Sequence, residues 1–594
     1  MARNKYNVDE GLSRHLDFSR LKRAFHYIKP YRKSMFLAFF ISTASSVCTL
    51  LIPLFMKQAI DVAMPEKNMG LLVRLSLFTL LVIIAGAILN GLRGLIMSRV
   101  GQNIIYTIRA DLFEHLQKLP FSYYDSRPHG KILVRVVNYV NNVSETLTNG
   151  IIDAVIDIIN IVFIAVFMFI LDPTLALIVL VGLPFLLAFV FLIKNKQKDA
   201  HMKSNNKNSN LTAYTCENIL GVKVVEIFDR QEKNLEIFKD LNAQYRRAWY
   251  KQATMSVLPS LVTENLKRWV ICLVYIGGVL WITPAVSIGV LTGMTSYASK
   301  FWDPIISLAN IYNEFLTSAS YLERIFQTMD EPIDISDGEN AKPLPNIKGD
   351  VEFNNVSFAY EKDIRILKNV SFRAKPGESI ALVGPTGAGK STIVNLISRF
   401  YNVTEGELRI DGVNINDITI HSLRSQMGIM LQDSFIFSGT IEDNVRYGRL
   451  DATSEEIRAA CRAVHADSFI ETFPEGYQTQ VSEGGGMLSQ GQKQLIAFAR
   501  TMLSNPAVLI LDEATSSIDA QTERYLQIGI EKLLRGRTSF IIAHRLSTIK
   551  NCDRILFIDG GRIVEAGTHD ELMAKHGAYY RLCSAHSSMP SEKK

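Results

Sequence analysis

A glycine-rich stretch at residues 384–391 has the composition and spacing of a phosphate-binding loop. It reads GPTGAGKS and matches the pattern G-x-x-x-x-G-K-[ST], with the apolar run SIALVG before it and STIVNLISRF after it. A buried strand followed by a helix would present backbone N–H groups and a helix N-terminus to phosphate oxygens. The residues expected to bind the nucleotide are Gly384, Pro385, Thr386, Gly387, Ala388, Gly389, Lys390, Ser391 and Thr392.

Two adjacent carboxylates follow a second apolar run. The run AVLIL (507–511) predicts a buried strand, and Asp512 and Glu513 come directly after it. With a phosphate-binding loop in the same domain, Asp512 is expected to hold Mg²⁺ together with Ser391, while Lys390 reaches the β- and γ-phosphates. Glu513 would orient or deprotonate the attacking water. Either acid alone is most often a solvated strand end, but the combination predicts an ATPase.

The order of motifs resembles that of ATP-binding-cassette exporters over essentially the whole chain. Five further segments carry the resemblance: VSFAY ending in Tyr360, IMLQDSFIF with Gln432, LSQGQ at 488–492, SSID at 516–519 and IIAHRLSTI with His544. The resemblance implies that Tyr360 stacks on adenine, Gln432 links Mg²⁺ and water to the membrane domain, and His544 contacts the γ-phosphate. Glu513, His544 and Gln432 are therefore the expected catalytic residues, with Ser391, Gln432 and Asp512 at the metal.

The signature segment departs from the usual pattern of the family at one position. The resemblance implies that Ser489, Gly491 and Gln492 close over ATP held by a second subunit, but Gln490 stands where the family has glycine. Glycine allows close backbone approach to phosphate, and glutamine adds a side chain there. The upstream residues 482–485 (SEGG) also depart from the usual Gly-Glu-Arg-Gly. The helix is expected to begin near Lys493, as KQLIAFARTML.

A chain with one membrane half and one ATPase half looks like a half-transporter that must dimerise. In a homodimer both ATP sites would carry Gln490. In a heterodimer, a partner with an intact signature would form one good site with Glu513, and the other site would be degenerate. The altered signature favours a heterodimeric multidrug-type exporter, and a homodimer that tolerates the substitution is the alternative.

The first half of the chain carries long uncharged runs. They cover residues 35–56, 75–92, 158–171, 173–193 and 269–299. A spanning helix needs about 20 mostly apolar residues, so the last run is long enough for two spans separated at Thr283-Pro284. We therefore expect six membrane-spanning helices whose inner ends continue as polar helices, with breaks near Leu119-Pro120 and Gly221.

The distribution of Lys and Arg predicts the orientation. Residues 1–33 hold nine Lys or Arg and three acids, whereas the turns at 172–174 and 283–288 hold no basic residue. Both termini are expected in the cytoplasm of a multi-pass protein in a bacterial plasma membrane, in contact with membrane lipid. By resemblance, the inner tips near 121–127 and 216–224 dock on ATPase domains.

Composition and charge complete the expected organisation. The fold class is an α-helical six-span transmembrane domain followed by an α/β P-loop ATPase domain. The expected segments are residues 1–330 (membrane), 331–348 (linker), 349–586 (ATPase) and 587–594 (disordered tail). A net charge of +6 over 594 residues gives no argument for nucleic-acid binding, and six scattered cysteines show no disulfide or metal spacing. The N-terminus shows no signal-peptide h-region.

The cargo is the least determined feature. Aromatic and Met-rich spans suit amphiphilic drugs or lipids, and a peptide is the alternative cargo. Five charged residues flank the last two spans and would either face a cavity or lie at the headgroups: Glu264, Lys267, Arg268, Lys300 and Asp303. An ATP-driven exporter is the favoured function, and a non-transporting ATP-gated channel or regulator is the alternative. Fusion of the two halves, membrane half first, disfavours an importer.

Overall fold

The computed structural model describes residues 18–125, 132–133, 135–281, 286–338, 340–361, 364–430, 434–512, 520–542 and 546–587. The chain divides into two compact units. The first contains Met1–Gln117 and Pro128–Glu331, and the second contains Lys118–Arg127 and Pro332–Lys594. Ten residues between two helices of the first unit thus belong with the second unit. Sequence reasoning expected this segment as a cytoplasmic tip.

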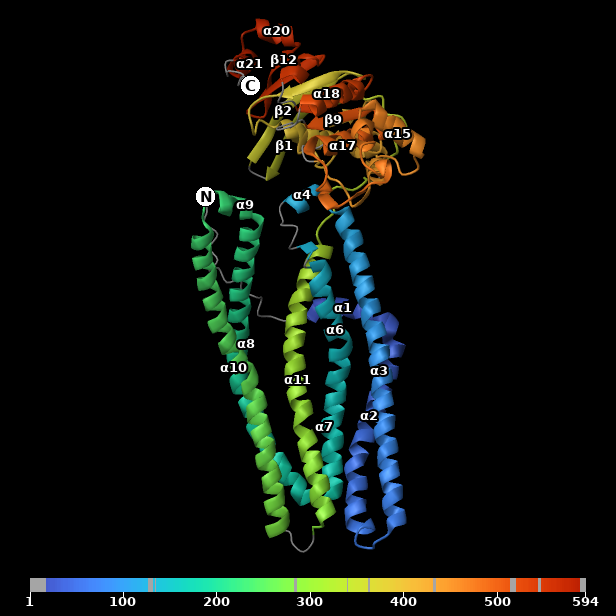
Figure 1. Cartoon of the computed structure of the whole chain (residues 1–594), viewed down its shortest axis with the longest axis vertical. Coiled ribbons are helices and arrows are strands. Elements are labelled where there is room, and N and C mark those ends of the chain that lie inside the picture. Colours follow the sequence, from blue (N-terminus) through green and yellow to red (C-terminus); the bar gives the residue numbers. More distant parts are fainter. Residues whose placement is uncertain are drawn as a thin grey trace. The chain divides into compact units, whose positions relative to one another are not determined.

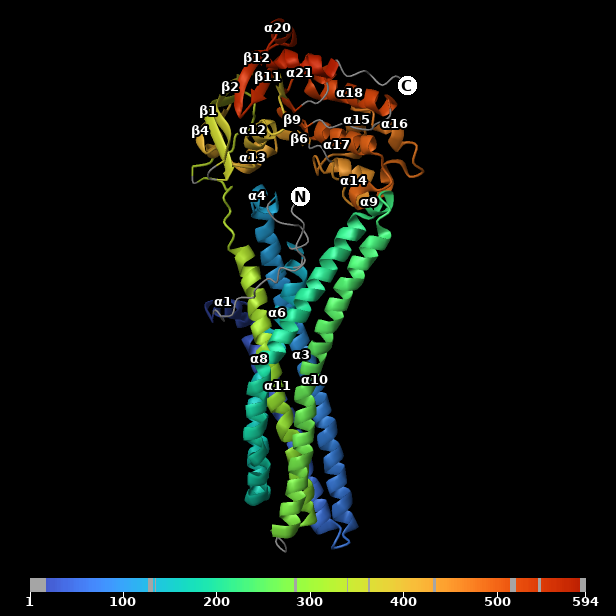
Figure 2. The ribbon, with the colours of Figure 1, turned by 90° about the vertical axis from the view of Figure 1, so that its left-hand side faces the viewer.

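The first unit is built from long helices (Figures 1 and 2). Helices α8 and α10 run side by side in both views. The helices are α1 (Phe18–Ile28), α2 (Arg32–Gln58), α3 (Met69–Lys118), α6 (Val140–Glu145), α7 (Ile151–Leu171), α8 (Pro173–Leu220), α9 (Val222–Ile227), α10 (Gln231–Ile276) and α11 (Ile288–Met329). Shorter helical turns are η1 (Lys29–Tyr31), η2 (Ala59–Ala63), η3 (Arg135–Tyr139), η4 (Thr146–Gly150) and η5 (Gly277–Trp281).

The helix breaks fall where the sequence predicts them. Asp172 caps α8 by accepting hydrogen bonds of 2.9 Å from the backbone N–H groups of Thr174 and Leu175, and Pro173 follows as the first helical residue. Helix α3 ends at Lys118, and Gly221 ends α8. The uncharged run 269–299 is interrupted between η5 and α11, although Thr283 and Pro284 themselves lie outside the described residues.

Four segments among the described helices are long and apolar enough to cross a membrane: Arg23–Ala63, Met69–Lys118, Arg135–Leu171 and Pro173–Leu220. They contain the first four predicted spans. Helices α10 and α11 contain the apolar residues assigned to the other two spans, and their crossing stays a prediction. The side chains of Trp302, Tyr297 and Phe301 are fully buried on α11, and a Cβ at Gly182 would lie 2.8 Å from the Trp302 ring. Close helix packing therefore holds this unit together.

The second unit contains two larger sheets. One is antiparallel with the order β2-β1-β4-β5, formed by β1 (Val351–Glu361), β2 (Ile364–Ala374), β4 (Glu405–Ile410) and β5 (Val413–Asn414). The other has the order β12-β11-β3-β10-β9-β6, formed by β3 (Ser379–Val383), β6 (Met427–Met430), β9 (Val508–Asp512), β10 (Thr538–Ile542), β11 (Arg554–Asp559) and β12 (Arg562–Gly567). A small pair joins β7 (Gly439–Thr440) and β8 (Gln480–Val481).

Helices surround these sheets, as expected for an α/β ATPase domain. They are α4 (Phe121–Asp125), α12 (Lys390–Ile397), α13 (Ile420–Arg424), α14 (Ile441–Arg446), α15 (Ser454–Ala463), α16 (Asp467–Ile470), α17 (Gln490–Ser504), α18 (Ala520–Leu534), α19 (Leu546–Lys550), α20 (His569–Ala574) and α21 (Ala578–Ser587). One core packs both sheets around Phe353 and Leu382, and another packs α15 and α17 around Ile457 and Ile496. These cores fix the strand ends that carry the motifs.

Candidate functional site

The central strands of the six-stranded sheet end level with one another at one edge. Strands β3, β10 and β9 are parallel, with Leu382 opposite Ile542 and Ile542 opposite Asp512. On the far side of β9, β6 is also parallel, with Met430 opposite Leu511. Loops that follow the carboxyl ends of parallel strands meet at the same edge, which is where such sheets bind ligands. The sheet therefore brings the predicted phosphate loop and Asp512 to one edge.

The phosphate loop requires its glycines. Gly384 has φ +149°, and a Cβ there would lie 2.0 Å from the Ile558 carbonyl oxygen. Gly389 has φ +107° and is the N-cap residue of α12, and as a glycine it offers no side chain to the first N–H groups of the helix. A loop whose first glycine lies against the backbone of β11, followed by the N-terminus of α12, has the shape and polarity to cradle phosphate.

Lys390 lies at the start of α12 and faces the loop. Its Nζ donates hydrogen bonds of 2.8 Å to the Gly384 carbonyl and 2.9 Å to the Pro385 carbonyl. Burial lowers the pKa of Lys390, and the negative charge of Asp512 partly opposes that shift. Lys390 and Asp512 are therefore near enough to interact electrostatically, and their roles at a phosphate–metal site stay predictions. Ser391 and Thr392 follow Lys390 in the first turn of α12.

Tyr360, the predicted adenine platform, lies near the end of β1 and is 46% exposed. Its hydroxyl donates to the Thr392 Oγ1 atom at 3.3 Å and accepts from the Asn395 Nδ2 atom at 3.3 Å. The ring also meets the Tyr401 ring edge-to-face, with centroids 4.9 Å apart. Neighbouring residues thus hold the Tyr360 side chain in place while much of the residue remains accessible, so a planar base can stack there.

The signature segment begins α17. Ser489 is the N-cap: its Oγ accepts from the Gln492 backbone N–H at 3.2 Å, and the Gln492 side chain accepts from the Ser489 N–H at 2.9 Å. This reciprocal cap starts the helix at Gln490, three residues earlier than the expected Lys493. Gln490 is exposed and Gly491 is buried. Gln490 is thus the first helical residue, a position that any L-residue adopts without strain.

Three predicted catalytic residues, Gln432, Glu513 and His544, lie outside the described residues, as does the SSID segment at 516–519. In the sequence they come immediately after three strands of the edge described above. Gln432 follows the last residue of β6 by two positions, Glu513 follows β9 directly, and His544 follows β10 by two positions. Their assigned roles stay predictions.

Sequence reasoning did not single out the aromatic pair Phe400 and Tyr401. Phe121 of α4 stacks on Phe400, with centroids 5.3 Å apart and planes 22° apart. The Tyr401 hydroxyl donates a 3.1 Å hydrogen bond to the Asp125 Oδ2 atom. Burial, reinforced by this bond and the charge of Asp125, raises the pKa of Tyr401. The signal that could have pointed to this pair is its position in the sequence, shortly after the helix of the phosphate loop.

A nucleotide-binding α/β domain fused to long apolar helices defines an ATP-driven membrane transporter. The comparisons agree: residues 35–305 match the ABC transporter transmembrane region, and residues 367–516 match the ABC transporter ATP-binding family. The chain belongs to the ABC transporters, with the two-part organisation of a half-transporter of the exporter type.

Relatives and a solved structure cover nearly the whole chain. A putative multidrug export ATP-binding/permease protein, YgaD of Bacillus subtilis, is 35% identical over 95% of this chain and 98% of its own length. A fatty acid ABC transporter ATP-binding/permease protein of Mycobacterium bovis is 38% identical over 89% of this chain and 82% of its own length. The structure of a bacterial Atm1-family ABC exporter with ATP bound has a TM-score of 0.79 and 28% identity, and covers 95% of this chain and 99% of that chain.

Proposed function

We propose that this protein is one half of a heterodimeric exporter that uses ATP to move amphiphilic small molecules, drugs or lipids, out of the cell by alternating access. ATP hydrolysis coupled to transport is common to the family to which the chain belongs. The observation that carries the proposal is the contrast within one ATPase domain between an intact phosphate loop and a signature helix that begins with Gln490. The names of two relatives, a multidrug export protein and a fatty acid transporter, support an amphiphilic cargo.

In this proposal ATP is held by the loop and by Tyr360. Lys390 would leave its two carbonyl partners for the β- and γ-phosphates, because phosphate oxygens carry charge that carbonyls lack. Ser391 and Asp512 offer the hard oxygen donors that suit Mg²⁺, and Asp512 is close enough to Lys390 to affect its pKa. Bound Mg²⁺ would neutralise phosphate charge as the reaction proceeds. Glu513 would accept a proton from the attacking water.

The signature face would serve the partner's ATP. Ser489, Gly491 and Gln492 lie at the start of α17, where backbone N–H groups are available to a γ-phosphate. Gln490 projects an exposed side chain at the same point. In a heterodimer the partner's signature would complete the site that contains Glu513, and the site closed by Gln490 would be slow.

The second cytoplasmic tip supports the need for a partner chain. Around Gly221 and along α9, apolar side chains are exposed in the single chain: Ile219 is 67% exposed, Leu220 82%, Ile227 78% and Phe228 70%. Exposed apolar patches of this kind mark interaction sites. The sequence predicted that residues near 216–224 dock on an ATPase domain, and we assign this tip to the ATPase domain of the second subunit.

The proposal is tested with inside-out vesicles that contain this chain alone, or this chain together with a candidate partner half-transporter. ATP-dependent accumulation of a fluorescent amphiphile is measured with and without the partner. Accumulation only with both chains supports the heterodimer. Vigorous transport by the chain alone would establish a homodimer instead. ATPase activity without accumulation of any amphiphile or peptide, together with an ATP-dependent ion conductance, would point to a channel or regulator.

A further inference from the structure

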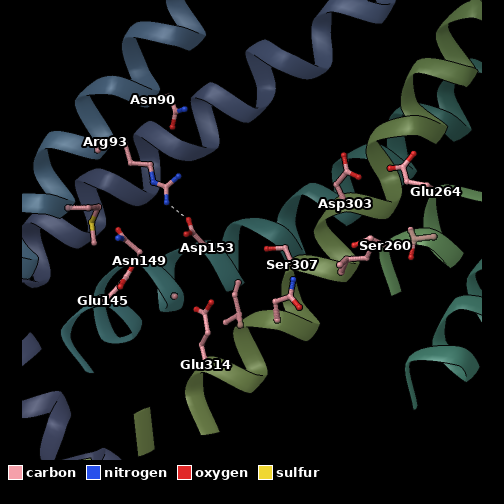
Figure 3. A pocket seen from close by; sticks show the side chains of 17 residues that line it. Asn90, Arg93, Glu145, Asn149, Asp153, Ser260, Glu264, Asp303, Ser307 and Glu314 are labelled. Carbon is pink, nitrogen blue, oxygen red and sulfur yellow. Dashed lines mark hydrogen bonds and ion pairs between the residues drawn. The ribbon is translucent and has the colours of Figure 1, made fainter. Parts of the chain in front are cut away.

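A polar cavity of about 810 Å³ lies among the helices of the first unit (Figure 3). It is lined from α3, from the segment running from α6 through η4 into α7, from α10 and from α11. Its ionisable lining consists of five carboxylates and one guanidinium: Glu145, Asp153, Glu264, Asp303, Glu314 and Arg93. These helix segments lie where the predicted spans meet their cytoplasmic extensions, a position at which a polar head group would enter from the inner leaflet.

The basic groups nearby do not balance these acids. Arg93 forms an ion pair with Asp153, shown by the dashed line in Figure 3. Lys267, next to the cavity, places its Nζ 3.8 Å from the Glu264 Oε1 atom and 3.6 Å from the Asp303 Oδ1 atom. Within the described ranges no hydrogen bond or ion pair is found for the carboxylates of Glu145 and Glu314. Negative charge therefore remains in excess.

This excess has a direct consequence for ligands. Glu145 and Glu314 line the cavity with exposed side chains, and their charges leave a negative potential there. A bound cation gains Coulomb energy from both glutamates. An anionic head group, such as a fatty acid carboxylate, meets repulsion at the same place. The negative charge of the cavity thus favours cationic over anionic amphiphiles, a distinction that apolar spans alone would not make.

A buried hydroxyl provides an independent observation. Thr263 of α10 lines the cavity and is 2% exposed, and its Oγ1 atom has no hydrogen-bond partner among the residues that the structure describes. Buried polar atoms are normally satisfied, so an unsatisfied one at a cavity wall marks a place for a ligand atom or water. The hydroxyl oxygen can accept a hydrogen bond from an ammonium group, while discrimination against a carboxylate head group comes from the charges of the glutamates.

We propose that this cavity selects cationic amphiphiles: it receives a protonated amine head group, with Glu145 and Glu314 supplying the charge and Thr263 a hydrogen-bond acceptor. The inference rests on the proposed export function, because a substrate class has meaning only for a transporter. It goes further by excluding fatty acid anions as the preferred cargo, although one relative is named as a fatty acid transporter.

The test uses a fluorescent alkylamine and the fluorescent fatty acid and alcohol of the same chain length. Binding to the purified full transporter, without ATP, is measured by fluorescence titration in nanodiscs, and ATP-driven uptake is measured separately in proteoliposomes. The wild-type protein should bind the amine at least tenfold more tightly than the alcohol or the acid. The double variant Glu145→Gln/Glu314→Gln should weaken amine binding roughly tenfold, equivalent to about 1.4 kcal/mol, and leave alcohol binding unchanged.

A matched control removes the same charge elsewhere. Glu236→Gln/Glu323→Gln neutralises two glutamates on α10 and α11 that do not line the cavity, and it should keep the preference for the amine. Equal or tighter binding of the fatty acid by the wild-type protein overturns the inference without any variant. Unchanged amine affinity in the double variant also overturns it. Amine binding without ATP-driven uptake of any probe would instead contradict the proposed export function and leave the charge selection standing.

Discussion

The Tyr401 hydroxyl donates a hydrogen bond of 3.1 Å to the carboxylate of Asp125, while the Tyr401 and Tyr360 rings pack edge-to-face with their centroids 4.9 Å apart. Asp125 lies on α4, and Tyr360 is the proposed adenine platform. One side chain therefore contacts both the proposed docking helix and the aromatic residue beside the phosphate-loop helix. A displacement of α4 can therefore be transmitted to the nucleotide site through these two contacts of Tyr401.

Tyr401→Phe should weaken the link between substrate binding and ATP hydrolysis. The variant keeps the ring against Tyr360 and removes only the bond to Asp125, which is exposed and contributes about 1 kcal/mol. A loss of that size corresponds to roughly a fivefold loss of coupling. Stimulation of ATPase activity by a transported amphiphile should fall, and ATP affinity should stay near the wild-type value.

Asp125→Asn should reproduce the Tyr401→Phe effect, because it removes the charge from the same bond. Tyr580→Phe removes a tyrosine hydroxyl on α21 and serves as the control with normal stimulation. Wild-type stimulation of ATPase activity in both Tyr401→Phe and Asp125→Asn would show that this hydrogen bond does not couple substrate binding to ATP hydrolysis.

Much of the ATPase site was predictable, because its motifs are local. GPTGAGKS sits between an apolar run and a helix, so strand, loop and helix follow from adjacent residues, and the structure has them at 379–383, 384–389 and 390–397. The helix breaks at Asp172 and Gly221 were predictable for the same reason, because helix capping and the effect of glycine on the backbone depend on a few neighbouring residues.

Features that depend on tertiary packing were not predictable. The contacts of Phe400 and Tyr401 with α4 join residues 275–280 positions apart, and no local pattern encodes them. The early start of α17 depended on whether Ser489 and Gln492 would cap each other. Of the five charged residues flagged near the last spans, Glu264 and Asp303 line the cavity, while Glu145 and Glu314 were missed because each looked like an ordinary polar helix residue.

Two substitutions separate nucleotide binding from turnover. Glu513→Gln should leave ATP binding largely intact and nearly abolish hydrolysis, because the amide cannot accept the proton of the attacking water. Lys390→Ala should weaken ATP binding instead, because it removes a charge-assisted contact with phosphate. Equilibrium binding of labelled ATP and steady-state ATPase assays on the assembled transporter test both. Near-normal turnover in the Glu513 variant would rule out its role as general base.

The two roles of Tyr360 can be distinguished with a pair of variants. Tyr360→Ala removes the exposed ring and should weaken ATP affinity by about 1–3 kcal/mol, by analogy with base stacking on aromatic residues. Tyr360→Phe removes only the hydroxyl that contacts Thr392 and Asn395, and it should bind ATP nearly as well as the wild-type protein. Equal affinities for all three proteins, measured with a labelled nucleotide, would assign Tyr360 a packing role.

The phosphate loop offers a matched pair of glycines. Gly384→Ala places a Cβ 2.0 Å from the Ile558 carbonyl oxygen, so strand β11 or the loop must move, and the ATPase domain should unfold at a clearly lower temperature. Gly387 has φ +81° but open space around the site of a Cβ. Gly387→Ala should therefore cost only about 1–2 kcal/mol of backbone strain. Thermal unfolding of the two purified variants compares them, and equal midpoints would contradict the steric account.

Gln490→Gly decides between the two kinds of dimer. The structure places Gln490 at the first position of α17, exposed, between the capping residues Ser489 and Gln492, so the substitution leaves the cap in place. In a heterodimer the Gln490 face closes over the slow site, whose rate depends on the partner's own catalytic residues. The substitution should then change overall turnover only slightly. In a homodimer both sites contain Gln490 and Glu513, and glycine would restore close backbone approach to phosphate at both, so turnover should rise severalfold. The measurement is ATPase activity of the chain alone and of the chain with its partner, each with and without the substitution. High activity of the chain alone, raised further by Gln490→Gly, would refute the obligate heterodimer.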